Sequence, residues 1–124
     1  MKLSKAKAQE LLYYLKLPRY IEERMLLLLR QGKISKWFSG IGQEAISVGI
    51  TYALNSEDYI LPMHRNLGVF TTRLKNKDFD KLFYQLFGKQ SGFTNGRDRT
   101  FHFGSKENRI IGMISHLAAM LPVA

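Results

Sequence analysis

The chain has 124 residues, 45% of them hydrophobic and 23% charged, a composition typical of one globular domain rather than a disordered segment. It contains no cysteine, which excludes a disulfide framework and any thiolate metal site and suits a reducing cytoplasm. Its apolar runs are too short to cross a bilayer and its N-terminus lacks a secretory signal pattern, so we expect a cytoplasmic protein without a membrane partner.

The net charge of +9 arises from 19 Lys and Arg against 10 Asp and Glu and raises the question of nucleic-acid binding. The basic residues are spread out, with nine in the first 36 positions and nine from Arg73 to Arg109. Exposed helix faces and a docking surface for an acidic partner explain this spread equally well. Direct nucleic-acid binding is therefore disfavoured.

The first 36 residues predict a helical N-terminal arm. Ser4 is suited to cap a first helix, and Pro18 to occupy the first turn of a second helix that Gly32 ends. We expect Glu22, Glu23 and Arg24 on the wetter side of the second helix, and we assign the arm a packing role without chemistry.

The next segment predicts a loop and a buried helix. Trp37, the only Trp, is expected to anchor the loop. The helix, over about 42–54, is apolar nearly all round. Ala45, Gly49 and Ala53 recur every four residues, so another backbone can approach this stripe, either within the chain or at a subunit interface.

Two short strands are predicted, over 59–61 and 110–114. Between them we expect two helices, one capped by Asn66 and one that starts at Asp78 and is stopped by Gly88, and then a loop over 89–109. An isolated pair of strands makes a marginal sheet with open edges. We therefore expect 37–124 to be the first, incomplete part of an α/β domain with a parallel sheet, in the amino-terminal part of a longer protein.

His64 and Arg65 follow the first predicted strand. Open α/β sheets place ligands at the carboxyl ends of their strands, and an Arg fork with an imidazole N–H beside it suits a phosphate. The alternative is an ordinary ion pair of this basic pair with one of the nearby acids Glu44, Glu57 or Asp58.

Two further segments hold candidate residues. The glycine-flanked loop 97–104 carries two arginines and His102 and could close over an anionic substrate, or could be a solvated loop that its phenylalanines tether to the core. Ser115 follows the second predicted strand, where a Ser commonly caps the next helix.

Taken together, five segments resemble the alpha subunit of the thiamine diphosphate-dependent 2-oxo acid dehydrogenases of the pyruvate and branched-chain type. In order, they are RYIEERMLLLLRQGKI, GIGQEAISVGITYAL, DYILPMHRNLGVF, GRDRTFHFGSKENRI and ISHLAAMLPVA, which together cover nearly all of the chain from Arg19 onward. The order and spacing of the five segments are more specific than any one of them.

The resemblance implies a fold, a reaction and roles for individual residues. The chain would be the amino-terminal part of a thiamine diphosphate-binding fold, in an enzyme that decarboxylates a 2-oxo acid and passes the acyl group to lipoamide. Arg65 would contact the diphosphate, with His64 at a position where the family usually has a tyrosine. Ser115 and Leu117 would line the thiazolium and aminopyrimidine region, and His102 would help to hold the substrate.

The resemblance also implies what this chain lacks. The family's magnesium ligands are expected beyond the end of the chain, and Ala119 and Met120 replace the ligands of a potassium site found in some members. The implied partners are a beta subunit or beta-like region, a lipoyl acyltransferase core, the 2-oxo acid and further copies of the chain in a homo-oligomer. We expect the isolated chain to be inactive; the alternative is a non-catalytic protein-interaction module derived from this fold.

Overall fold

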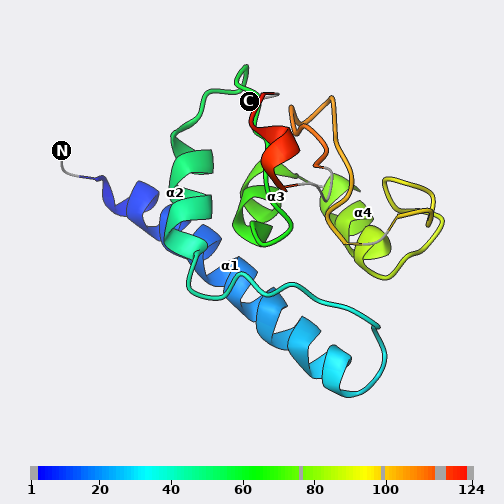
Figure 1. Cartoon of the computed structure of the whole chain (residues 1–124). Coiled ribbons are helices and arrows are strands. Elements are labelled where there is room, and N and C mark those ends of the chain that lie inside the picture. Colours follow the sequence, from blue (N-terminus) through cyan, green and yellow to red (C-terminus); the bar gives the residue numbers. More distant parts are fainter. Residues whose placement is uncertain (1–2, 76, 99, 114–116, 123–124) are drawn as a thin grey trace. The chain divides into compact units, whose positions relative to one another are not determined.

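A computed structural model describes residues 3–75, 77–98, 100–113 and 117–122 (Figure 1). The described residues form four α-helices and one short 3₁₀ helix. These are α1 (Lys5–Arg30), α2 (Glu44–Ala53), α3 (Leu67–Arg73), α4 (Lys77–Leu86) and η1 (Leu117–Met120).

The chain divides into two compact units, which we treat separately. The three-helix unit comprises residues 1–54 and 66–73 and contains α1, α2 and α3. The loop unit comprises residues 55–65 and 74–124 and contains α4 and η1. None of the described helices is both long and apolar enough to cross a membrane.

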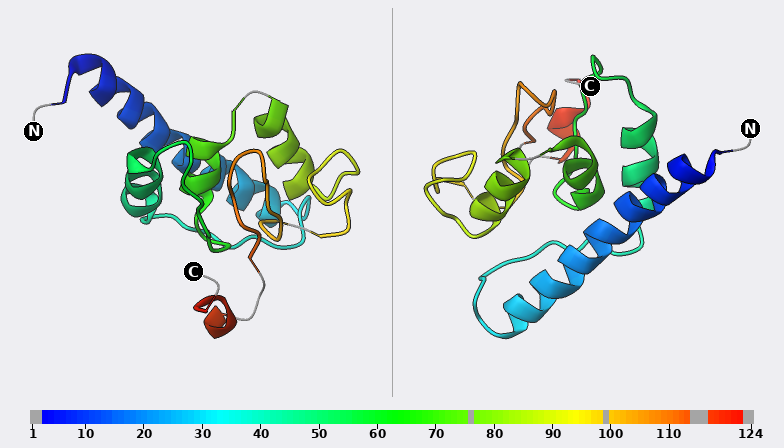
Figure 2. Two further views of the ribbon diagram at one scale, coloured as in Figure 1. Left: turned by 90° about the horizontal axis from the view of Figure 1, so that it is seen from above. Right: turned by 180° about the vertical axis from the view of Figure 1, so that it is seen from behind.

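Helix α1 is one continuous helix of 26 residues, which corrects the expectation of two helices meeting at Pro18 (Figure 2). Ser4 caps it as predicted, accepting a hydrogen bond from the Lys7 N–H at 3.3 Å. Pro18 is buried inside the helix, where it gives up one backbone hydrogen bond. The helix ends at Arg30, before Gly32, whose φ of +68° favours glycine.

Helix α2 is not buried all round, which corrects a second expectation. Ser47, Val48 and Thr51 form its buried face, whereas Ala45, Gly49 and Ala53 of the small-residue stripe are exposed. A Cβ on Gly49 would meet nothing within 4 Å. The close helix contact lies instead at another glycine, in α3.

That glycine is Gly68, at the start of α3. A Cβ added there would lie 2.2 Å from the Ser47 Oγ and 2.9 Å from the Val48 Cγ2, so only glycine lets α3 approach α2 this closely. Both helices pack against α1. The core of the three-helix unit includes Ile21, Met25, Val48, Leu67, Val69 and Phe70.

The expected start of a parallel sheet is reduced to bridges between single residues, and the described residues form no strand. Ile60 pairs with Ile110 in parallel, and Ile110 pairs with Ser105 in antiparallel orientation. The predicted α/β architecture is therefore not supported in this chain, whose described elements are helical. Pairing of two strands is marginal without neighbours that bury both faces, and this chain supplies only short extended segments.

The loop unit is organised around α4 and the residues that follow it. Leu82 and Leu86 of α4 are buried with Phe101, Phe103 and Ile110. As predicted, α4 ends before a glycine: Gly88 has a φ of +64°. The segment after it is made of turns, in agreement with the predicted loop.

We predict opposite stability changes for Gly68→Ala and Gly49→Ala. The first forces a methyl group against Ser47 and Val48 and should lower the free energy of unfolding by about 1–3 kcal/mol. The second adds a methyl group in open space on a helix and should raise it by about 0.5–1 kcal/mol. Urea denaturation followed by circular dichroism measures both, and equal effects would contradict the packing described here.

Candidate cofactor site

Three extended segments meet at Ile110 in the loop unit. The Ile60 N–H donates to the Arg109 carbonyl at 2.9 Å, and the Ile111 N–H donates to the Ile60 carbonyl at 2.9 Å. On its other side, Ile110 exchanges two hydrogen bonds of 2.8 and 2.9 Å with Ser105. Because the 60 and 110 segments run in the same direction, the residues that follow each of them leave the bridge from the same end.

His64 and Arg65 form a turn four and five residues after the bridge. His64 is half-buried and Arg65 is exposed, so an imidazole and a guanidinium follow the bridge; their role at a phosphate stays a prediction. In the other segment, Ser115 lies outside the described residues. Leu117 begins η1, but its side chain is not described.

Each acid considered as a partner of this basic pair makes a contact with another residue. Glu57 forms an ion pair with Arg109 at 2.6 Å, and Glu44 forms one with Arg19 at 2.7 Å. The third acid, Asp58, accepts a hydrogen bond from the Asn55 N–H at 2.8 Å.

The loop that carries His102 is held by buried phenylalanines. Phe101 and Phe103 are buried on either side of the half-buried His102, and Phe103 stacks on Phe93 with 4.2 Å between ring centroids. Thr100 has a φ of +55°, which is rare for a β-branched residue. Tethering by phenylalanines was part of the alternative interpretation of this loop, as a solvated loop; the stack was not predicted.

Gln85 of α4 is a second anchor of this loop, and sequence reasoning missed it. Its side chain is buried, its Nε2 donates to the Asp98 carbonyl at 2.8 Å, and its Oε1 accepts from the Thr94 N–H at 3.0 Å. A Cβ on Gly92 would lie 2.8 Å from the Gln85 Cα. The Gln85 side chain therefore fixes the backbone of the loop to α4. Sequence composition does not reveal such a contact.

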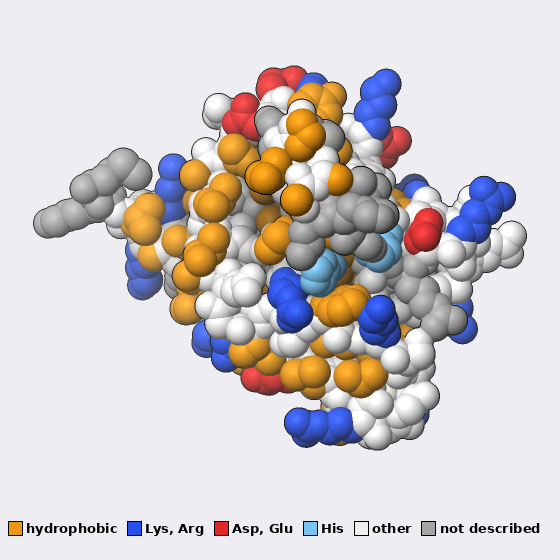
Figure 3. Space-filling model, viewed as in Figure 1, with side chains coloured by type: hydrophobic (Ala, Val, Ile, Leu, Met, Phe, Trp, Pro, Cys, Tyr) orange, Lys and Arg blue, Asp and Glu red, His pale blue; other side chains and the backbone are white. Residues whose placement is uncertain are grey.

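The two described histidines, His64 and His102, belong to the same unit. Figure 3 shows histidine side chains on one face of the molecule, near Lys or Arg side chains. Two imidazoles with the Arg65 guanidinium are hydrogen-bond donors suited to an anion. Among the described residues, no group of three or more His, Cys, Asp or Glu could hold a metal ion.

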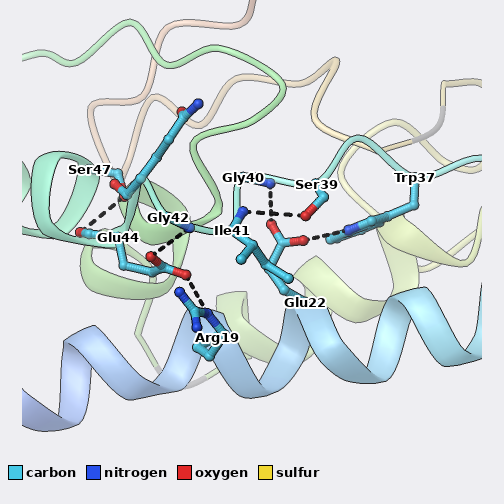
Figure 4. Close-up of polar contacts among 10 residues, drawn as sticks. Arg19, Glu22, Trp37, Ser39, Gly40, Ile41, Gly42, Glu44 and Ser47 are labelled. Atoms are coloured by element: carbon cyan, nitrogen blue, oxygen red, sulfur yellow. Dashed lines mark hydrogen bonds and ion pairs between the residues drawn. The ribbon is translucent and has the colours of Figure 1, made fainter.

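A buried carboxylate fixes the loop that leads into α2, as Figure 4 shows. Glu22 of α1 is only 2% exposed, which corrects its predicted place on the wetter side. It accepts hydrogen bonds from the Trp37 indole N–H at 2.7 Å and from the Gly40 N–H at 2.8 Å. Two signals could have revealed it: Glu22 lies on the helical line of Pro18 and Met25, and a buried Trp needs an acceptor.

A second carboxylate ties α1 to the start of α2. Glu44 accepts from the Arg19 Nε at 2.7 Å and from the Gly42 N–H at 2.9 Å. The hydrogen bond from Arg19 is the main cause that lowers the pKa of Glu44 below its usual range. The same hydrogen bond raises the pKa of Arg19. Gly42 has a φ of +94°, which favours glycine at this turn.

Comparison with known proteins shows which family this chain belongs to. Residues 14–124 match the family described as "Dehydrogenase E1 component". The match covers most of the chain and includes the 64–65 turn, the His102 loop and the Glu22 cluster. The chain belongs to this family.

Individual relatives agree with this assignment. The chain is 41% identical over 111 residues to the 2-oxoisovalerate dehydrogenase subunit alpha of Bacillus subtilis, an alignment that spans 87% of this chain and 33% of the relative. It is 33% identical over 95 residues to the mitochondrial subunit alpha 1 of Arabidopsis thaliana and 32% identical over 95 residues to the human mitochondrial subunit. Those alignments span 77% of this chain and 20% and 21% of the relatives. The chain thus spans a third or less of these relatives.

We predict that Glu22→Gln loosens the loop before α2. A glutamine offers one acceptor oxygen where the carboxylate offers two, so either Trp37 or Gly40 loses its partner. The free energy of unfolding should fall by about 1–3 kcal/mol, and the emission of Trp37 should shift to longer wavelength as water reaches it. The matched control is Glu23→Gln, one residue along and exposed, which should change neither.

We predict a pH-dependent effect for Glu44→Gln. Because the folded-state pKa of Glu44 is lowered, its stabilising contribution is present above the unfolded-state pKa of a glutamate, about 4.3. It is lost as the pH falls through the lower folded-state value. The difference in urea midpoint between wild type and variant should therefore be largest at neutral pH and shrink below about pH 4; a difference independent of pH would contradict the pairing with Arg19.

Proposed function

We propose that this chain is the amino-terminal part of a thiamine diphosphate-binding domain in the alpha subunit of a 2-oxo acid dehydrogenase. The enzyme would decarboxylate a 2-oxo acid oxidatively and pass the acyl group to lipoamide. The similarity to the Bacillus subtilis subunit, 41% over 111 residues, carries the proposal. Because such relatives are named 2-oxoisovalerate dehydrogenases, a branched-chain 2-oxo acid is the substrate class that we propose.

Within that enzyme, Arg65 would bind the diphosphate. Its guanidinium is exposed at the end of the parallel bridge, and a planar fork fits phosphate oxygens. His64, half-buried beside it, would donate a further hydrogen bond where the family usually has a phenol. These donors fit the anionic end of thiamine diphosphate, which when bound supplies the electron sink for decarboxylation.

The remaining site residues have proposed roles around the same cofactor. Ser115 and Leu117 would line its thiazolium and aminopyrimidine region. His102 would hold the 2-oxo acid, because a half-buried imidazole on a loop fixed by phenylalanines can present a hydrogen bond at a constant position. We further propose that the magnesium ligands lie outside this chain; among the described residues, no group of three or more His, Cys, Asp or Glu could hold a metal ion.

The proposal includes a domain division and partners. A helical arm over residues 1–36 would pack against the first part of the cofactor domain over 37–124, with Arg19 and Glu22 contacting residues of that domain. The partners would be a beta subunit, a lipoyl acyltransferase core and further copies of the chain. The exposed stripe of Ala45, Gly49 and Ala53 would suit a subunit interface, and the cytoplasm is the proposed location.

The exposed stripe of α2 also supports the alternative, a protein-interaction module without catalysis. Such a module would need the packing surfaces but not Arg65. Substitution of Arg65 therefore separates the two functions.

We predict that Arg65→Gln weakens cofactor binding in a chimeric enzyme. Residues 14–124 would replace the matching segment of the Bacillus subtilis alpha subunit, produced together with its beta subunit. Release of carbon dioxide from carboxyl-labelled 2-oxoisovalerate, measured against thiamine diphosphate concentration, gives the KM for the cofactor. Arg65→Gln should raise this KM by about tenfold or more, because a hydrogen bond to a charged group contributes roughly 1.5–3 kcal/mol. Arg65→Lys should have an intermediate effect.

The control is Lys75→Gln, which removes one exposed positive charge from the same unit and should leave the KM unchanged. Sedimentation confirms that each chimera assembles. An assembled chimera that releases no carbon dioxide would favour the interaction module. Equal KM values for the Arg65 and Lys75 variants would contradict the role of Arg65. The 124-residue chain alone should release no carbon dioxide.

A further inference from the structure

The outer side of α1 carries a continuous exposed stripe that the proposed function does not use. From the third turn of the helix onward, the exposed positions repeat every three or four residues along one side, over about 27 Å at roughly 1.5 Å of rise per residue. They are Leu12, Tyr13, Lys16, Tyr20, Glu23, Arg24, Leu27 and Arg30. We call this stripe the outer α1 face.

Large apolar and aromatic side chains on this face are left in water. Leu12, Tyr13, Tyr20 and Leu27 are between 40% and 63% exposed. They lie on the opposite side from the buried residues Pro18, Ile21, Glu22 and Met25, which pack into the three-helix unit. A contiguous row of exposed apolar side chains bordered by charges is typical of an interaction surface.

The charges on the face are predominantly positive. Lys16, Arg24 and Arg30 stand against a single acid, Glu23. Within the part of the chain that the structure describes, none of these three cations forms an ion pair. They therefore remain available to carboxylates of another molecule.

The spacing of the face is that of a helix-pairing surface. Tyr13, Tyr20 and Leu27 lie seven residues apart, and a second row, also with a spacing of seven, lies three positions later: Lys16, Glu23 and Arg30. Two interleaved rows with this spacing have the geometry of a coiled-coil seam; both rows of such a seam are usually apolar, whereas the second row here is charged. In a straight α-helix, residues seven positions apart are rotated about the helix axis by roughly 20°. Over these two heptads the rotation is about 40°, so both rows stay on the exposed side.

We propose that the outer α1 face binds an acidic amphipathic helix of a partner protein. The partner would place apolar side chains between Tyr13, Tyr20 and Leu27, and carboxylates opposite the cations of the second row. A basic side chain opposite Glu23 would set the register. The net charge of +9 on the chain would speed the encounter with such a partner.

Other occupants fit this face less well. A lipid surface favours a wide apolar face with cations along its edges, whereas here the cations lie in the same stripe as the aromatic rings. A second copy of the chain would bring three cations against the same three cations, which like-charge repulsion disfavours. Glu23, in the middle of the stripe, opposes nucleic acid.

Fluorescence anisotropy with a synthetic acidic helix tests the proposal. The probe is a labelled peptide of about four heptads with leucine at a and glutamate at d, which cannot pair with itself without opposing its own carboxylates. The intact 124-residue chain should bind it, less tightly as ionic strength rises. The charge reversal Lys16→Glu with Arg30→Glu should weaken binding by about tenfold or more.

Matched variants separate this face from general electrostatics. Lys75→Glu with Lys89→Glu makes the same change in net charge at exposed positions of the other unit and should change affinity by no more than about twofold. Tyr13→Ala with Tyr20→Ala should weaken binding without altering the charge, while circular dichroism confirms that α1 remains folded.

The proposal would be overturned if both charge-reversal pairs lost the same peptide affinity, or if a peptide with lysine in place of glutamate bound equally well. It would also be overturned if the chain bound phosphatidylserine vesicles or single-stranded DNA through Lys16 and Arg30 but did not bind the acidic helix. A fourth contrary result is a chain that does not bind the peptide but forms a dimer, which Tyr13→Ala with Tyr20→Ala dissociates.

Discussion

The buried carboxylate of Glu22 is the interaction on which the three-helix unit depends. Its two oxygens accept the N–H groups of Trp37 and Gly40, which brings the loop back onto α1 before α2 begins. A buried carboxylate costs free energy unless each of its oxygens is hydrogen-bonded, so the loop and the helix require each other. Glu44, at the start of α2, makes a similar pair of contacts, with Arg19 of α1 and with Gly42 of the loop. The entry into α2 is thus set by two acids rather than by apolar packing alone.

Local signals in the sequence were sufficient for the helix ends and the loops. Ser4, Gly32 and Gly88 mark the ends of helices as predicted, because caps and left-handed positions depend on the residue itself. Burial was harder to predict. Glu22 was predicted on the wetter side, because residue type does not show that a distant N–H will donate to its carboxylate. The whole of α2 was predicted in the interior, because residue type does not show whether another helix will cover its isoleucines.

The candidate site shows the same division between local and distant information. Residues 64 and 65 form a turn after the bridge, and buried phenylalanines flank His102, which is the tethering that the alternative interpretation of this loop predicted. Among the described residues, the predicted sheet is reduced to single bridges at Ile60 and Ile110, because strand pairing draws its stability from neighbouring strands and covering helices. The anchor provided by Gln85 also depends on a fold-level contact, with backbone groups at Thr94 and Asp98. Residue chemistry predicts which groups can bind an anion, but the support beneath them is set by the fold.

The internal use of acids adds to the basic character that the net charge of +9 already gives the surface. The three-helix unit has four acidic residues, and three of them are engaged by its own groups: Glu10 by Tyr52, Glu22 by Trp37 and Gly40, and Glu44 by Arg19 and Gly42. Only Glu23 remains on the outer α1 face to offset Lys16, Arg24 and Arg30. Net charge by itself is an argument about solubility and non-specific attraction. Its distribution here is more informative, because the same hydrogen bonds that build the loop before α2 remove negative charge from the surface and leave a basic, aromatic helix face for another molecule to cover.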